Sequence, residues 1–149
     1  MQLPHYLAAL AAADRALADG YDAVARAHGG VADVALTCRS FARAARTRGD
    51  ALAAVCDERY PAGSAEGAPA AFADAPPGPL ALLRDLAELA RLAGFVQTGW
   101  EVVVQAASGL RDRALLADAQ ECVHALHVET AWIDGKMKGE AAQALLVAE

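Results

Sequence analysis

The chain has 149 residues, a length that fits one domain burying roughly two-thirds of its unfolded surface. Hydrophobic residues make up 56% and aromatic residues only 5% of it, because alanine and leucine dominate, and both favour helix. A formal charge of −6 at pH 7 repels phosphate backbones and anionic lipid, so nucleic acid and membrane surfaces are not expected as partners. The composition predicts a single all-α domain spanning residues 1–149.

The cysteines and the N-terminal residues indicate the cellular compartment of the protein. Cys38, Cys56 and Cys122 are far apart and odd in number, which favours a reducing compartment over a disulfide framework. The stretch MQLPHYLAALAAADR has no basic region, and Asp14 interrupts its apolar run, so no signal peptide is predicted. No apolar run approaches the ~20 residues that a membrane-spanning helix needs. We therefore expect a cytoplasmic protein.

Apolar residues at steps of three and four predict the first two helices. The first pattern fills residues 4–28, starting at Pro4, which suits a first helical position. Glycines 29 and 30 end it, and a second pattern follows at residues 31–59. Because the connection is so short, these two helices should form an antiparallel hairpin.

Residues 60–79 are rich in Pro, Gly and Ala, have no helical period, and are predicted to form a long loop. At ~3 Å per residue it could span ~60 Å, more than the ~42 Å of a helix of about 28 residues, so a crossover and an up-down-up-down bundle both remain open. Helices are predicted at 79–108 and 112–138, the last fraying around Gly135 and Gly139. Four helices with one apolar stripe each predict a four-helix bundle.

Two charged residues lie on the apolar stripes, Asp14 in the first helix and Arg48 in the second. Around a turn at residues 29–30, facing positions sum to about 59, which places Arg48 about one turn from Asp14. A buried charge is costly unless it is paired. We therefore predict a structural Asp14–Arg48 ion pair inside the bundle, with Tyr21 and Gln97 as further hydrogen-bonding candidates.

Acidic and histidine side chains could instead form a metal centre. Bundle metal sites combine inward Glu residues with Glu-x-x-His pairs, and Asp14, Glu101 and Glu129 lie on or beside their stripes. His28 ends the first stripe and is expected as a cap or a packed core histidine. The fixed charge of Arg48 would repel a divalent cation and neutralise Asp14. No metal is therefore expected, and the alternative is an iron or manganese site built from Asp14, His28, Glu101 and Glu129.

Glu121 and His124 have the Glu-x-x-His spacing of di-iron bundle proteins. At ~100° per residue they lie about 140° and 160° from Leu126, the centre of the fourth stripe. They should therefore face away from the core, which makes them weaker candidates for metal ligands. Val128 and Trp132 share that outer side, and the sequence suggests a homodimer contact there.

No catalytic residue is predicted. The chain contains no nucleophile elbow, phosphate loop, Cys-x-x-Cys motif or dinucleotide fingerprint. The question of enzymatic activity stays open at this level, and a protein without catalysis is favoured.

Several segments of packing and turn residues span nearly the whole chain: HYLAAL, VARAH followed by ADV and TC, PLALLRDLAEL, QAASGLRD and AAQALLVAE. In these segments the chain resembles small bacterial proteins of the ferritin-like, four-helix kind. The resemblance implies a ferritin-like fold and no particular activity. The favoured hypothesis is a non-catalytic structural or protein-interaction module without bound metal. The alternatives are a ferritin-like di-metal carboxylate protein with oxidase or metal-handling activity, and a carrier of an apolar ligand.

Overall fold

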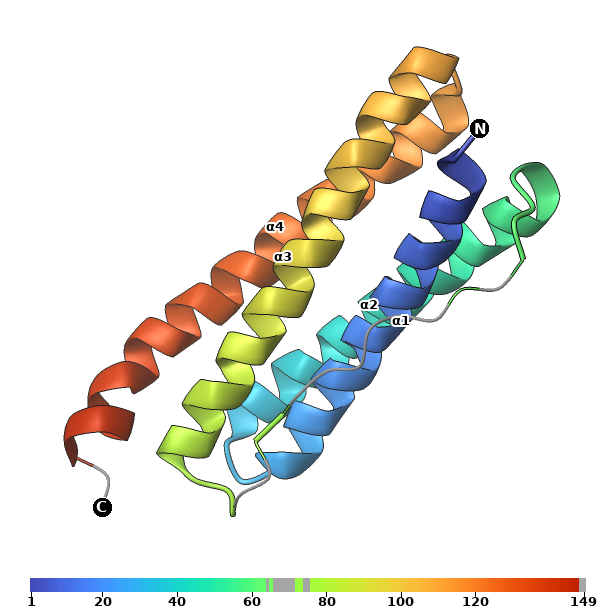
Figure 1. Cartoon of the computed structure of the whole chain (residues 1–149). Coiled ribbons are helices and arrows are strands. Elements are labelled where there is room, and N and C mark those ends of the chain that lie inside the picture. The colour runs from blue at the N-terminus through green and yellow to red at the C-terminus, as the bar shows by residue number, and fades with distance from the viewer. Residues whose placement is uncertain (64, 66–71, 74–75, 148–149) are drawn as a thin grey trace.

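The computed structural model describes residues 1–63, 65, 72–73 and 76–147. It contains four long helices, α1 (Leu3–Ala27), α2 (Ala32–Arg59), α3 (Pro79–Leu110) and α4 (Arg113–Ala142), followed by a short π-helix, η1 (Gln143–Val147). No strand occurs in this described part of the chain. The helices lie side by side along one long direction (Figure 1), so the predicted all-α, four-helix architecture is confirmed. No helix among the described residues has both the length and the apolar character needed to cross a membrane.

The predicted helix boundaries hold for α1, α2 and α3 to within two residues at each end. The predicted fraying of the last helix is wrong, because α4 continues through Gly135 and Gly139 to Ala142. Lys136 stabilises this segment, since its ammonium lies 2.8 Å from Asp33 of α2 and 2.9 Å from Glu140 one turn later. These ion pairs offset the low helix propensity of the two glycines.

Local sequence explains where the helices begin and end. Pro4 and Pro79 lie in the first turns of α1 and α3, where a missing N–H leaves no hydrogen bond unmade. Asp112 caps α4, because its side chain accepts a hydrogen bond from the backbone N–H of Leu115 at 3.0 Å. Arg111 ends α3 in the left-handed conformation, with φ of 56°, which closes the helix as a C-cap turn.

The structure decides the topology that the sequence left open. Arg59 and Tyr60, at the end of α2, hydrogen-bond to Asp112 in the turn after α3. Residues 77–79, at the start of α3, line one pocket together with residues 29–30 between α1 and α2. The helices α2 and α3 therefore run parallel, and the end of α2 and the start of α3 lie at opposite ends of the bundle (Figure 1).

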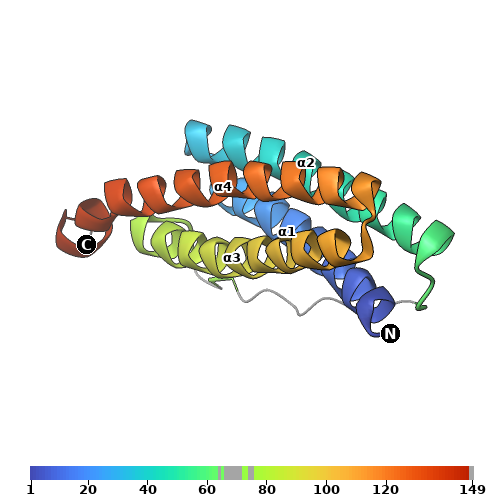
Figure 2. The same cartoon turned by 90° about the horizontal axis from the view of Figure 1, so that it is seen from above.

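The two hairpins meet mainly through α1 and α3. Gly99 of α3 allows this approach, since a Cβ there would lie 2.6 Å from Leu10 Cδ1 of α1. Figure 2 shows that α1 and α2 run obliquely across α3 and α4. The shared core is dominated by fully buried aliphatic side chains, among them Leu7, Leu17, Leu86, Leu89, Leu126 and Ile133.

Candidate functional site

A cluster of charged side chains lies buried where all four helices face one another. Asp14 of α1, Arg48 of α2 and Glu129 of α4 are 0%, 7% and 2% exposed, and Trp100 of α3 is 2% exposed. Each of these four residues lies three or four positions from buried apolar residues of its own helix. Residues at this spacing share one face of a helix, so all four side chains point into the core. We call these four residues the Arg48 cluster.

The guanidinium of Arg48 binds two carboxylates. Its Nε donates to Asp14 Oδ1 at 3.1 Å, and its Nη2 lies 3.0 Å from the same oxygen. On the other side, Nη1 and Nη2 donate to the two oxygens of Glu129 in a bidentate arrangement. The indole Nε1 of Trp100 donates to Asp14 Oδ2 at 2.8 Å. The Arg48 guanidinium thus forms ion pairs with both Asp14 and Glu129, and every polar group of the cluster has a hydrogen-bond partner.

Burial controls the ionisation of the cluster. Burial raises the pKa of Asp14 by more than Arg48 and Trp100 lower it, and the negative charge of Glu129 adds a smaller rise. Burial also acts to lower the pKa of Arg48, but the hydrogen bonds and charges of Glu129 and Asp14 outweigh it, and that pKa is raised. Arg48 therefore remains a fixed positive charge at any physiological pH.

The predicted partners Asp14 and Arg48 are joined, and two further members were missed by sequence reasoning. Glu129 enters the sequence analysis only as an alternative metal ligand, although its position three residues after Leu126 and four before Ile133 indicates the core face. The role of Trp100 as a donor had no signal in the sequence, because it depends on how α3 packs against α1.

Tyr21 and Gln97, the two further hydrogen-bonding candidates, form no hydrogen bond with Asp14 or Arg48. Tyr21 is fully buried, and its hydroxyl has no hydrogen-bond partner among the described residues. Burial, followed by the nearby charge of Glu129, raises the pKa of Tyr21. Gln97 instead joins α3 to α4: it accepts a hydrogen bond from Thr130 Oγ1 at 3.2 Å, and its Nε2 lies 3.2 Å from Nδ1 of His127.

Of the four residues of the alternative metal centre, the structure brings together only Asp14 and Glu129, which both bind Arg48. Glu101 is exposed, so its predicted position beside the stripe is wrong; it follows buried Trp100 by one residue and so points about 100° away from it. His28 lies at the end of α1, where Nε2 is 2.7 Å from Asp85 Oδ2. Within the described ranges, no group of three or more His, Cys, Asp and Glu side chains could share a metal ion.

His28 and Asp85 form a second buried polar pair, and they are 3% and 2% exposed. The other oxygen of Asp85 accepts a hydrogen bond from the backbone N–H of Ala73 at 2.7 Å. Asp85 therefore ties the end of α1 and the crossover connection to α3. A packed His28 is predicted from the sequence, whereas Asp85 was missed. The spacing of Asp85 from Leu82 and Leu89, three and four residues, does indicate an inward position.

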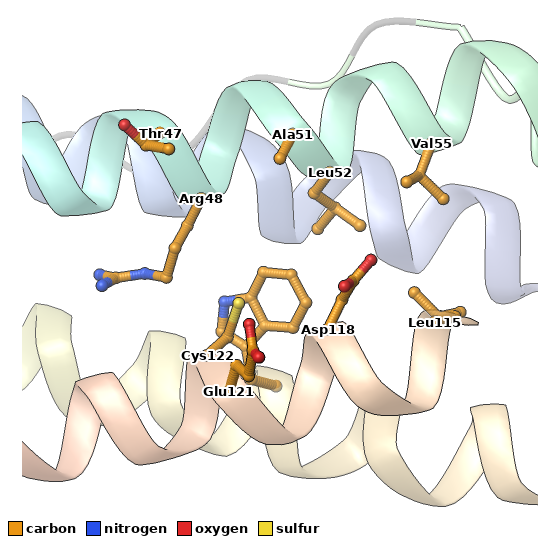
Figure 3. A pocket seen from close by; sticks show the side chains of 10 residues that line it. Thr47, Arg48, Ala51, Leu52, Val55, Leu115, Asp118, Glu121 and Cys122 are labelled. Carbon is orange, nitrogen blue, oxygen red and sulfur yellow. The ribbon is translucent and has the colours of Figure 1, made fainter. Parts of the chain in front are cut away.

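Glu121 and His124 are both exposed, as their angular position predicts. Glu121 nevertheless takes part in a pocket of about 240 Å³ that adjoins the Arg48 cluster between α2 and α4. Its lining is formed by Thr47, Arg48, Ala51, Leu52, Val55, Trp100, Leu115, Asp118, Glu121 and Cys122. Figure 3 shows the guanidinium of Arg48 pointing away from the carboxylates of Asp118 and Glu121.

The predicted contact side of the last helix divides into two parts. Val128 is 54% exposed. Trp132 is half-buried and packs edge-on against Phe41 of α2, with 5.7 Å between ring centroids. The expectation that both residues share one outer side is therefore corrected, because Trp132 joins α4 to α2.

Fold and site together define an all-α four-helix protein whose centre holds a buried ion cluster. Comparison with protein-family models, with curated proteins and with solved structures yields no match for this chain.

Proposed function

We propose that this chain is a non-catalytic four-helix bundle of the ferritin-like type that acts as a structural or protein-interaction module and holds no metal. The observation that supports this most strongly is the engagement of the Arg48 guanidinium by Asp14 and Glu129. In metal-binding bundles, inward carboxylates from facing helices are the ligands. Here a permanent cation already occupies the oxygens that a metal would need.

The alternative, a di-metal carboxylate protein using iron or manganese, requires Arg48 to leave its place. Freeing Asp14 and Glu129 for a metal would break a buried ion pair on both sides, and breaking one such pair costs about 3–5 kcal/mol. The displaced guanidinium would also lie close to the incoming cation and repel it.

The single long crossover supports the ferritin-like part of the proposal, because bundles of that type use one such connection. Three large apolar side chains on three helices support an interaction role: Leu36, Phe95 and Val128 are 66%, 67% and 54% exposed. We propose that the Val128 side of α4 forms a homodimer contact. The three cysteines are free, which is compatible with the proposed cytoplasmic location.

Metal analysis tests the central claim. Protein expressed in medium with iron, manganese and zinc, and purified without chelator, should contain less than about 0.1 metal ion per chain by plasma mass spectrometry. Added Fe²⁺ or Mn²⁺ should leave the melting temperature unchanged, because a ligand that does not bind the folded state cannot stabilise it. One or two tightly held ions per chain, lost in Asp14→Ala, would contradict the proposal and support the di-metal alternative.

A further inference from the structure

We propose that the pocket between α2 and α4 binds a small organic cation, in which an ammonium, amidinium or guanidinium group is attached to a short apolar body. This inference goes beyond the proposed function and does not depend on it. It rests on three properties of the pocket, which are its charge, its apolar floor and its size.

The charge at the pocket is strongly negative. The carboxylates of Asp118 and Glu121 lie at its α4 side (Figure 3), and neither forms a hydrogen bond or ion pair with any described residue. The nearest buried cation, Arg48, is turned away from them and is already shared by two carboxylates of its own cluster. The two pocket carboxylates thus have no cation of their own among the described residues, and a further cation is the partner that their charge favours.

In the part of the chain that the structure describes, no basic side chain forms an ion pair with Asp118 or Glu121. Asp112, and more weakly Asp118, raise the pKa of Arg59. However, the Arg59 guanidinium donates a hydrogen bond to Asp112 at 2.6 Å. Arg59 therefore compensates the helix-capping carboxylate and leaves the pocket carboxylates available.

The floor of the pocket requires an apolar body on the cation. Leu52, Trp100 and Leu115 are 2%, 2% and 1% exposed and line the pocket. Trp100 adds an indole, the side chain whose ring attracts cations most strongly. A bare metal ion would gain nothing from this lining, and an anion would be repelled by the carboxylates.

The size of the pocket limits the ligand. Its volume of about 240 Å³ falls below the roughly 300–1,000 Å³ typical of sites for drug-sized ligands. A single ring or a short alkyl chain with one charged group fits this space. Such a group could belong to a free small molecule or to a lysine or arginine side chain of a partner protein.

Benzamidine and its neutral analogue benzamide provide a matched pair of probes. We expect benzamidine to shift the NMR signals of the Trp100 indole N–H and of the Cys122 backbone amide in a saturable manner, with a Kd of roughly 1 mM for a fragment of this size. Benzamide should bind at least about tenfold more weakly, and the benzamidine affinity should fall with added salt. Equal affinity for the two probes, or no saturable shift, would overturn the proposal.

Two variants locate the binding. Asp118→Asn combined with Glu121→Gln should weaken benzamidine about five- to tenfold, since each exposed ion pair contributes modestly. Ala51→Leu should abolish saturable binding by filling the pocket from α2. As a matched control, Asp134→Asn removes a carboxylate of the same helix, about 20 Å along the axis from Glu121 and about 24 Å from Asp118, and should leave the affinity unchanged. Unchanged binding in the double variant, whose changes are on the exposed surface, would refute the site even if Ala51→Leu fails to fold.

A third titration separates the two sources of the cation. A capped Gly-Arg-Gly peptide that binds at least about tenfold more tightly than benzamidine would indicate a basic side chain of a partner protein. Equal or weaker binding of the peptide would indicate a free small molecule. Both results support the cation site, and metal analysis of the same samples reports separately on the proposed function.

Discussion

Arg48 shows why a long, charged side chain is tolerated at the centre of this bundle. Its guanidinium donates to Asp14 and to Glu129, and Trp100 supplies the remaining oxygen of Asp14 with a donor. A buried polar network is favourable only when each member is satisfied. The Tyr21 hydroxyl is a buried polar group that lacks a hydrogen-bond partner among the described residues. It is not part of the Arg48 network.

Removing the cation should therefore be costly. Arg48→Met leaves Asp14 and Glu129 buried without a counter-ion and should lower the free energy of unfolding by about 3–5 kcal/mol in urea titrations. The double variant Asp14→Leu/Arg48→Met should recover only part of this loss, because Glu129 stays unpaired. Adding Glu129→Leu should recover most of the remainder, apart from about 1–3 kcal/mol for the orphaned indole N–H of Trp100.

Arg46 provides the control for this experiment. It lies on the same helix, and its 43%-exposed side chain forms surface ion pairs with Asp19 and Asp22. Arg46→Met should change stability by less than about 1 kcal/mol. Similar losses for Arg46→Met and Arg48→Met would show that the buried cluster has no special role in stability.

The raised pKa of Asp14 predicts a pH dependence with a defined sign. Between its ordinary pKa of 3.8 and its higher folded pKa, the folded state binds a proton more readily than the unfolded state. The stability that Asp14 contributes is therefore fully present below pH 3.8 and is lost as the pH rises through the folded pKa. The stability of the wild type relative to Asp14→Asn should decrease as urea titrations move from acid to neutral pH.

Asp112 should behave in the opposite way. The backbone hydrogen bond from Leu115, with further help from Arg59 and Tyr60, lowers the pKa of Asp112 below 3.8. Its contribution is present above that value and is lost as the pH falls. Wild type relative to Asp112→Asn should therefore gain stability with rising pH, and slopes of the same sign for both residues would contradict these assignments.

At the scale of the helices, close contacts depend on glycine at particular positions. A Cβ at Gly49 of α2 would lie 3.0 Å from the backbone oxygen of Ala11 and 2.9 Å from Cγ of Arg15. Because a helix backbone cannot move aside as a side chain can, the two helices of the first hairpin would have to separate.

Alanine substitution at two glycines should therefore have opposite effects. Gly49→Ala should lower the free energy of unfolding by about 1–3 kcal/mol, as overpacking does. Gly94 of α3 has no atom within 4 Å of the position of a Cβ, so Gly94→Ala should raise the free energy of unfolding by about 1 kcal/mol through helix propensity. Thermal melts of both variants, followed by circular dichroism, measure the difference. A melting temperature that rises in Gly49→Ala would rule out the close α1–α2 packing.

At the scale of the whole molecule, the two hairpins pack so that α2 lies opposite α4. Side-chain contacts join these two helices. Lys136 pairs with Asp33 near one end, and Trp132 packs on Phe41. Nearer the other end, the gap between the same two helices contains the pocket next to Arg48 (Figure 3). A surface site and a buried ion cluster are therefore neighbours in this architecture.

The proposed homodimer can be tested on the whole molecule. Val128→Asp places a charge on the exposed part of α4, where burial against a second copy would be unfavourable. The wild type should sediment as a dimer at micromolar concentration, and the variant should sediment as a monomer that keeps its helical circular dichroism spectrum. Val102→Asp, which alters a side chain of similar exposure on α3 (45% against 54% for Val128), is the control. A wild type that is monomeric at all concentrations would exclude this contact.

The helices and the first hairpin follow from the sequence alone, because helical periodicity, prolines in first turns and glycines at a short connection act locally. The Asp14–Arg48 ion pair could be predicted from the sequence for the same reason, because the turn at residues 29–30 sets the register between α1 and α2. Both conclusions need only contacts within one hairpin.

The tertiary structure decided the remainder. Arg48 and Glu129 are 81 residues apart, and Asp14 and Trp100 are 86 apart, so their contacts depend on how one hairpin packs against the other. The long connection allows two topologies by its length alone. The close packing of α1 against α3 determines which inward carboxylate contacts Arg48 and where a pocket stays open. No local sequence pattern encodes this packing.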